Sequence, residues 1–249
     1  KKSINKILLN NLKKNSKWLT LNSILVQFYD LFDKYLVKIF FGPVALATYS
    51  IPQQLTGKLS ILSKGFSAFL LPFLSKKNFS NDDFNTTIKI FLIFIPIIIF
   101  LFFPLFELFL KLWLGSQFNN HILELTKIFS LSVIFSCASH ILVTKFEATQ
   151  TLKHNLKFEF SLMPFFLILL FYLTVNSFSI LMIGSLILLK EIILLFFRLN
   201  LLKKSINNFK IYYIYSVLFL FVLFFSFNNQ IIFYVLVFLL ILNLFKNGK

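Results

Sequence analysis

Apolar runs of helical length fill most of this 249-residue chain, and they restrict it to a fold embedded in a membrane. Hydrophobic residues make up 58% of the sequence and charged residues 14%, far from the balance of an ordinary soluble domain. A bilayer core needs about 20 residues of helix, and shorter runs can span it when flanking side chains reach the surface. The runs lie at residues 18–41, 44–74, 88–114, 121–143, 158–175, 178–199, 211–227 and 230–245. The sequence therefore predicts an all-α, polytopic membrane bundle of about eight transmembrane helices.

Basic residues gather in alternate connections between these runs. The connections on the side of the N-terminus hold most of the 25 lysine and arginine residues, Lys145 and Arg198 among them, whereas the other side holds only Lys111. Such a bias marks the cytoplasmic connections of membrane proteins. We therefore expect an even number of spans, with both termini in the cytoplasm.

Two of the predicted helices, at residues 18–41 and 44–74, carry polar side chains along one face. Steps of three and four residues place such side chains on the same side of a helix. The first stripe consists of Ser16, Thr20, Ser23, Gln27, Asp30, Lys34 and Lys38. The second consists of Ser50, Gln53, Gly57, Ser60, Lys64 and Ser67, widened by Gln54 and Lys58. Charges are costly in hydrocarbon, so the stripes predict the wall of a water-filled cationic cavity for an anionic cargo.

These stripes supply the candidate site residues. The residues predicted to bind substrate are Lys34, Lys64, Lys58, Lys38, Gln27 and Gln53. Asp30 and Asp33 are candidates for binding a coupling proton or sodium ion, as carboxylates do in transporter cavities. Structural roles compete with these functions. Asp30 and Lys34 are spaced for an intrahelical ion pair, both carboxylates could neutralise neighbouring lysines, and Lys38 lies near enough to the end of its span to extend to the surface.

Other polar residues carry no catalytic or metal-binding pattern. The sequence contains no GxxxxGK[ST] or GxGxxG phosphate loop, its one cysteine is Cys137 in an apolar run, and its three histidines fall at different depths of the predicted topology. Lys190 and Glu191 are predicted to be polar residues of helix packing. The net charge of +16 follows from the basic connections. We therefore expect no catalytic residue, no metal, no cofactor and no nucleic acid partner.

Three segments together resemble a known family. They are DLFDKYLVKIFFGPVALATYSIPQQLTGKL at residues 30–59, LPFLSKK at 71–77 and LWLG at 112–115. Their order and spacing are similar to those of O-antigen (Wzx-like) flippases in the multidrug/oligosaccharidyl-lipid/polysaccharide exporter superfamily. One departure is Lys34, where members often carry arginine after the aspartate. Lysine keeps the charge and loses the bidentate geometry with which arginine holds a phosphate.

The resemblance implies two six-helix bundles around a central cavity, of which this chain is the C-terminal half. Residues 1–17 would be a cytoplasmic basic linker, residues 18–200 the second six-helix bundle, and residues 201–249 two additional helices. The N-terminal half-bundle of the same protein would be missing from the chain and would be its partner, alongside membrane lipids.

The expected activity is that of a flippase rather than an enzyme. The cargo implied by the resemblance is an undecaprenyl-pyrophosphate-linked oligosaccharide, an O-antigen or capsular repeat unit, which would cross the bacterial cytoplasmic (inner) membrane by alternating access. One alternative is a cation-coupled multidrug exporter of the same superfamily, for which carboxylates would be expected in place of the lysines. Another is a membrane polysaccharide polymerase, which needs a large external loop. The predicted external connections are too short for one.

Overall fold

The computed structural model describes residues 6–74, 95, 98–99, 102, 104–149 and 152–202, with residues 6–15 and 19 described by their backbone alone. The described chain is helical, with short turns and no strand. Its elements are α1 (Lys6–Gly57), α2 (Ser60–Leu74), the 3-10 helix η1 (Gly115–Gln117), α4 (Asn120–Ala148), α5 (Leu152–Val175) and α6 (Ile180–Leu201). The all-α prediction is confirmed for these residues.

Four helical segments of the described chain are long and apolar enough to cross a membrane. They are Ser16–Leu74, Asn120–Ala148, Leu152–Val175 and Ile180–Leu201. The predicted spans at 211–227 and 230–245 lie outside the described residues, as does most of the span at 88–114. The count of about eight spans therefore stays a prediction.

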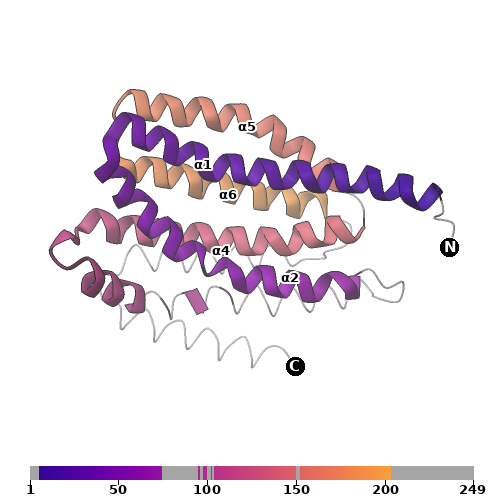
Figure 1. Ribbon diagram of the computed structural model, residues 1–249, viewed down its shortest axis with the longest axis horizontal. Coiled ribbons are helices and arrows are strands. Elements are labelled where there is room, and N and C mark those ends of the chain that lie inside the picture. Colours follow the sequence, from indigo (N-terminus) through magenta and orange to yellow (C-terminus); the bar gives the residue numbers. More distant parts are fainter. Residues whose placement is uncertain are drawn as a thin grey trace.

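The first of these segments turns back on itself at Gly42. This residue has φ of 86° and ψ of 177°, a conformation that glycine adopts without the steric cost of a Cβ, and Pro43 follows it. In a straight helix Asp33 and Tyr49 would lie about 24 Å apart, yet their side chains are hydrogen bonded at 2.7 Å. α1 is therefore a hairpin with an outgoing arm (residues 6–41) and a returning arm (residues 43–57), as Figure 1 shows. The predicted break at Gly42-Pro43 is confirmed.

A second break interrupts the helix predicted for residues 44–74. Lys58 and Leu59 form a turn between α1 and α2, and Leu59 N donates to Thr56 O at 3.0 Å, a bond of the tighter 3-10 type. Gly57 precedes the turn, and glycine is a weak helix former because it loses the most backbone freedom on folding. The prediction of one uninterrupted helix is wrong at this point, although α2 continues the chain to Leu74.

The connection predicted around residues 144–157 is much shorter in the structure. α4 continues to Ala148 and α5 begins at Leu152, so Lys145, Lys153 and Lys157 belong to helices. Hydropathy detects only the apolar part of a helix, and the backbone continues helical through the polar residues that follow. At the other end of α4 the predicted turn at 115–120 is confirmed, since Asn119 caps the helix by accepting from Ile122 N at 2.9 Å.

α4 is the central helix of the bundle. It packs against α1, α2, α5 and α6, and it is buried along most of its length. It lies close to α6 at Gly184, where an added Cβ would lie 2.9 Å from Leu125 Cδ2. Small polar residues also lie in its buried surface, at Ser130, Ser132 and Ser139, as is common where membrane helices pack closely.

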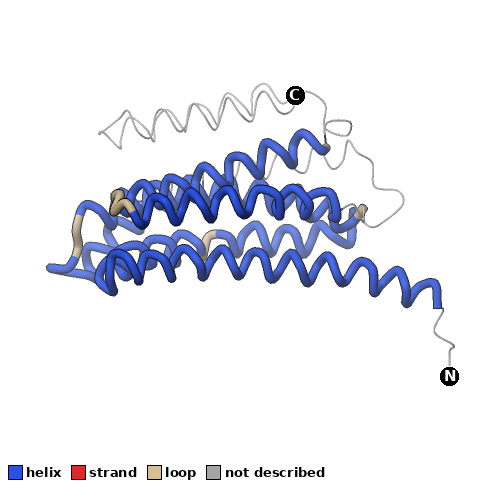
Figure 2. Tube along the Cα trace, turned by 90° about the horizontal axis from the view of Figure 1, so that it is seen from above, coloured by secondary structure: helices blue, strands red, loops and turns tan. Residues whose placement is uncertain are grey.

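The connections divide between the two ends of the bundle. Figure 1 shows the reversal at Gly42, η1 and the α5–α6 turn at one end, and the start of α1 with the ends of α2 and α6 at the other. In the view of Figure 2 the described helices again run along a shared direction between these ends. This grouping agrees with the alternation on which the predicted topology depends. The side of the membrane at which each end lies stays a prediction.

Candidate functional site

A cavity of about 250 Å³ lies among α1, α2, α4, α5 and α6, and we call it the polar cavity. Its described lining includes charged side chains of both signs: Lys64, Lys190 and Arg198 against Asp30, Glu159 and Glu191, with His140 beside them. This volume is large enough for several water molecules, and the polar lining would offer them hydrogen-bond partners. The cavity is thus balanced in charge over the described residues, which differs from the predicted cationic cavity.

One side of the polar cavity is built on a buried ion pair that sequence reasoning missed. Arg198 of α6 pairs with Glu159 of α5 through Nη2 and Oε1, and its Nε donates to Asn155 Oδ1 at 2.9 Å. Asn155 Nδ2 in turn donates to Glu159 Oε1 at 2.9 Å. The prediction that Arg198 belongs to a connection is wrong, because the residue is buried in the last turn of α6. The four-residue spacing of Asn155 and Glu159 was the available signal.

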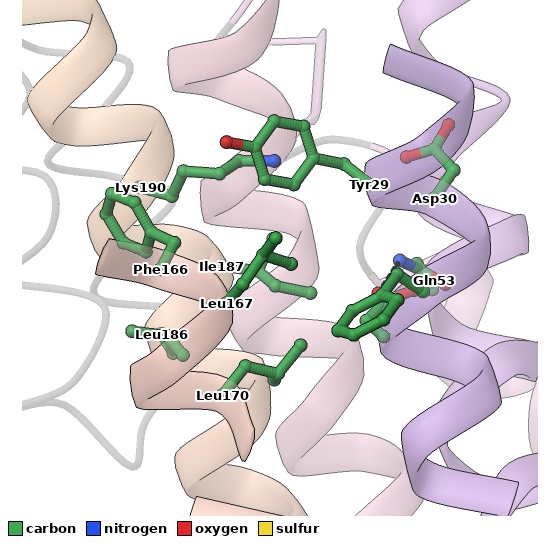
Figure 3. Close-up of a pocket in the computed structure, with 11 residues that line it drawn as sticks. Tyr29, Asp30, Gln53, Phe166, Leu167, Leu170, Leu186, Ile187 and Lys190 are labelled. Carbon is green, nitrogen blue, oxygen red and sulfur yellow. Dashed lines mark hydrogen bonds between the residues drawn. The ribbon is translucent and has the colours of Figure 1, made fainter. Parts of the chain in front are cut away.

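Lys190 lies between the polar cavity and a second, smaller one. Its Nζ is 3.3 Å from Glu191 Oε1 and 4.4 Å from the centre of the Tyr29 ring, an ion pair combined with a cation–π contact. Figure 3 shows Lys190 and Tyr29 meeting above the smaller cavity. The sequence favours a role in helix packing for Lys190 and Glu191. The structure places both in the lining of the polar cavity.

The smaller cavity, which we call the inner pocket, has a volume of about 50 Å³. Its polar lining is Tyr29, Asp30, Asp33, Gln53 and Lys190, and apolar residues of α1, α5 and α6 close the rest. Asp33 accepts hydrogen bonds from Tyr49 Oη at 2.7 Å, from Gln53 Nε2 at 3.0 Å and from its neighbour's backbone nitrogen at 2.7 Å. Asp30, by contrast, is exposed and lines both cavities.

Lys34 and Lys38 lie elsewhere, in a shallow groove of about 390 Å³ that we call the amphipathic groove. The remaining lining residues are apolar or aromatic: Phe28, Leu31, Phe32, Tyr35 and Leu46. Leu31 and Tyr35 are 69% and 60% exposed, so the groove is open on the outside of the described bundle. Gln27 is exposed on the same arm.

The structure therefore separates the residues that the sequence grouped together. Lys34 and Lys38 share the amphipathic groove, Lys64 lines the polar cavity, and Lys58 is exposed at the break between α1 and α2. Gln53 lines the inner pocket. Of the salt bridges in the described chain, none joins Asp30 to Lys34, so the competing intrahelical pair is not formed.

Comparison with known proteins gives one distant relative. The chain is 26% identical over 140 residues to a protein of Shigella flexneri named "Putative O-antigen transporter". The match covers 54% of this chain and 32% of the relative, so the chain corresponds to about a third of that protein. No protein-family model and no solved structure matches the chain. The apolar helices and this similarity together support a multi-pass membrane protein related at a distance to an O-antigen transporter.

Proposed function

We propose that this chain is part of a transporter that moves a lipid-linked oligosaccharide, carried on undecaprenyl pyrophosphate, across the bacterial cytoplasmic membrane. The observation that carries the proposal is the exposed polar face of the outgoing arm of α1. Gln27, Asp30 and Lys38 are exposed there in a helix long and apolar enough to cross a membrane. Lipid cannot satisfy such groups, so this face borders water or another protein surface. The similarity to an O-antigen transporter supports the same function.

The chemistry of the amphipathic groove fits a lipid that carries an anionic head group. Phe28, Leu31 and Tyr35 offer an apolar surface for an isoprenoid chain, and the two lysines offer positive charge. Lys34 and Lys38 are one turn apart on the same helix face, which separates their Cα atoms by about 6 Å along the axis. Two flexible lysine side chains at this spacing can both reach one pyrophosphate group.

A further bundle of helices would cover the exposed face and complete the cavity. The matched segment is 32% of the Shigella protein, which leaves ample chain in that relative for another bundle. In our proposal the partner of this chain is such an N-terminal half-bundle, and alternating access follows from rocking of the two bundles around the groove. Both termini of the chain would lie in the cytoplasm.

The polar cavity would serve ion coupling rather than cargo binding. Asp30 lines this cavity and the inner pocket, and it is exposed, so a proton or sodium ion could reach its carboxylate from the hydrated side. The carboxylates of the polar cavity also favour one rival function, export of a cationic drug. The two cargoes have opposite charge and are therefore easily distinguished.

Complementation tests the proposal: the complete transporter is expressed in a strain that lacks its own flippase, and the surface polysaccharide is measured. The complete transporter carrying Lys34→Gln and Lys38→Gln should restore far less surface polysaccharide than the unmodified protein at equal membrane abundance. Lys111→Gln is the matched control, because Lys111 is paired with Glu107 outside the groove. Unimpaired export by the double variant, or drug resistance conferred in place of export, would contradict the proposal.

A further inference from the structure

Asp33 joins the two arms of the α1 hairpin. Its Oδ2 accepts from Tyr49 Oη at 2.7 Å and from Gln53 Nε2 at 3.0 Å, and both of these donors belong to the returning arm. Its Oδ1 accepts from the backbone nitrogen of Lys34 at 2.7 Å. Asp33 is 4% exposed and Tyr49 is fully buried, so the bond between them is shielded from bulk water. We call this arrangement the Asp33 clamp.

The Asp33 clamp adds directional polar contacts to a hairpin whose arms also share a buried apolar cluster, in which Val37 of the outgoing arm lies with Tyr49 of the returning arm. At Gly42, where the chain turns, no atom lies within 4 Å of the place that a Cβ would occupy. The Gly42 position itself is therefore open, and the contacts that fix the angle and register of the two arms lie farther along them. The Asp33 hydrogen bonds lie a few helical turns away from Gly42. At that distance a small change in the angle between the arms moves the side chains of one arm well away from those of the other.

The amphipathic groove depends on this register. Its lining comes from both arms, with Lys34, Lys38 and Tyr35 on the outgoing arm and Leu46 on the returning arm. Lys34 is also the residue whose backbone nitrogen donates to the clamp. A carboxylate that holds both arms and adjoins a groove lysine is well placed to fix the shape of the groove and the positions of its cations.

We infer that Asp33 is a positioning residue that holds Lys34 and Lys38 in register with the returning arm, and not an ion-coupling carboxylate. This inference rests on the proposed function of the amphipathic groove. A carboxylate has about four sites for accepting hydrogen bonds, and three are occupied here by donors of the protein itself. A coupling proton or sodium ion at Asp33 would weaken or displace these hydrogen bonds, whereas Asp30 is exposed and lines both cavities.

Tyr49→Phe separates the two roles of Asp33, because it removes one clamp donor and leaves every carboxylate in place. The purified protein is tested for binding of two probes, undecaprenyl pyrophosphate and undecaprenol. Both Asp33→Asn and Tyr49→Phe should raise the Kd for undecaprenyl pyrophosphate about tenfold, because a displaced lysine would lose about one charge-assisted contact with the pyrophosphate. The Kd for undecaprenol should not change. Tyr172→Phe is the matched control, since Tyr172 is 55% exposed on α5 and touches neither the groove nor the clamp.

The double variant Asp33→Asn, Tyr49→Phe should bind undecaprenyl pyrophosphate about as weakly as either single variant, because both remove the same clamp. A protein that is merely destabilised would lose affinity for both probes, and that result would overturn the inference. The inference would also be overturned if the Tyr49→Phe protein bound undecaprenyl pyrophosphate like the unmodified protein while the Asp33→Asn protein bound it more weakly. That pattern is expected of an ion-binding carboxylate.

A distance measurement tests the clamp without any cargo. Spin labels on Ile24→Cys and Gln54→Cys, in a Cys137→Ser background, report the separation of the two arms from exposed positions outside the groove. The distance distribution should be narrow with the clamp intact and clearly broader in Asp33→Asn and in Tyr49→Phe. An unchanged distribution in both variants would overturn the inference. If the unmodified protein fails to prefer undecaprenyl pyrophosphate, the proposed function fails, and the distance measurement still decides the clamp.

Discussion

Glu159 of α5 and Arg198 of α6 form a buried ion pair although they are 39 residues apart in the sequence. Asn155 bonds to both partners, so each charged group has a second hydrogen-bond partner. Removing one member of a buried pair leaves an uncompensated charge, which typically costs about 3–5 kcal/mol, whereas replacing both with apolar residues is often neutral.

This pair gives the first prediction. Glu159→Gln should lower the free energy of unfolding by about 3 kcal/mol or more, because it leaves the Arg198 guanidinium buried and uncompensated. The double change Glu159→Leu, Arg198→Met should recover most of the loss. Unfolding of the purified protein in mixed detergent measures both values. Lys111→Gln, which breaks an exposed pair with Glu107, should cost no more than about 1 kcal/mol. A Glu159→Gln protein as stable as the Lys111→Gln protein would contradict the prediction.

A second prediction concerns the contact between α4 and α6. The Cβ of Gly184→Ala would lie 2.9 Å from Leu125 Cδ2, so Leu125 or the helix must shift. Inserting a methyl group into a packed interface typically costs about 1–3 kcal/mol. Gly65→Ala is the control, because no atom lies within 4 Å of the added Cβ there, and alanine at a helical position should stabilise the protein slightly. Equal effects of the two changes on unfolding would show that α4 and α6 do not approach so closely.

The reversal of α1 gives a third prediction. At φ of 86° and ψ of 177° a residue with a Cβ is strained, at a cost of about 1–3 kcal/mol. Gly42→Ala should therefore destabilise the protein even though the added methyl group meets open space. Comparison with Gly65→Ala isolates the backbone effect, since both sites are open and only Gly42 has a positive φ. Unfolding measurements that give Gly42→Ala no penalty would mean that the chain does not turn there in this conformation.

The predicted topology gives a fourth. Single cysteines at positions 119 and 228, in a Cys137→Ser background, should react with impermeant thiol reagents added to intact cells, and a cysteine at position 81 should not. The expectation follows from the charge bias between connections, which assigns position 81 to the cytoplasm. Position 119 is exposed and caps the start of α4. Labelling of position 81 in sealed cells would contradict the predicted topology.

Some features of the fold could be read from the sequence because they depend on one residue or one helix at a time. Gly42-Pro43 predicts a break by itself, since glycine accepts positive φ and the residue before a proline disfavours the helical conformation. The polar stripe on the outgoing arm could likewise be found from its three- and four-residue steps, and its exposed residues Gln27 and Lys38 lie on the outside of the described bundle.

The grouping of site residues could not be predicted, because it depends on how each helix is rotated against its neighbours. Lys34 and Lys64 have similar stripes around them, yet one lies in the amphipathic groove and the other in the polar cavity. Arg198 was assigned to a connection because hydropathy treats each helix in isolation and ignores the facing Glu159. Lys190 of α6 contacts the ring of Tyr29 of α1, and no residue spacing within α6 indicates this pairing.

Reconstituted transport tests the central proposal most directly. The complete transporter in proteoliposomes is supplied with an undecaprenyl-pyrophosphate-linked oligosaccharide, and its arrival in the opposite leaflet is followed by accessibility to a sugar-specific enzyme. A cationic dye is the second cargo. We expect movement of the oligosaccharide and not of the dye, and a rate at least about tenfold lower for the Lys34→Gln, Lys38→Gln variant at low cargo concentration, with Lys111→Gln unchanged. Movement of the dye, or equal oligosaccharide rates for the double variant and the unmodified protein, would contradict the proposal that this chain guides an anionic lipid-linked cargo.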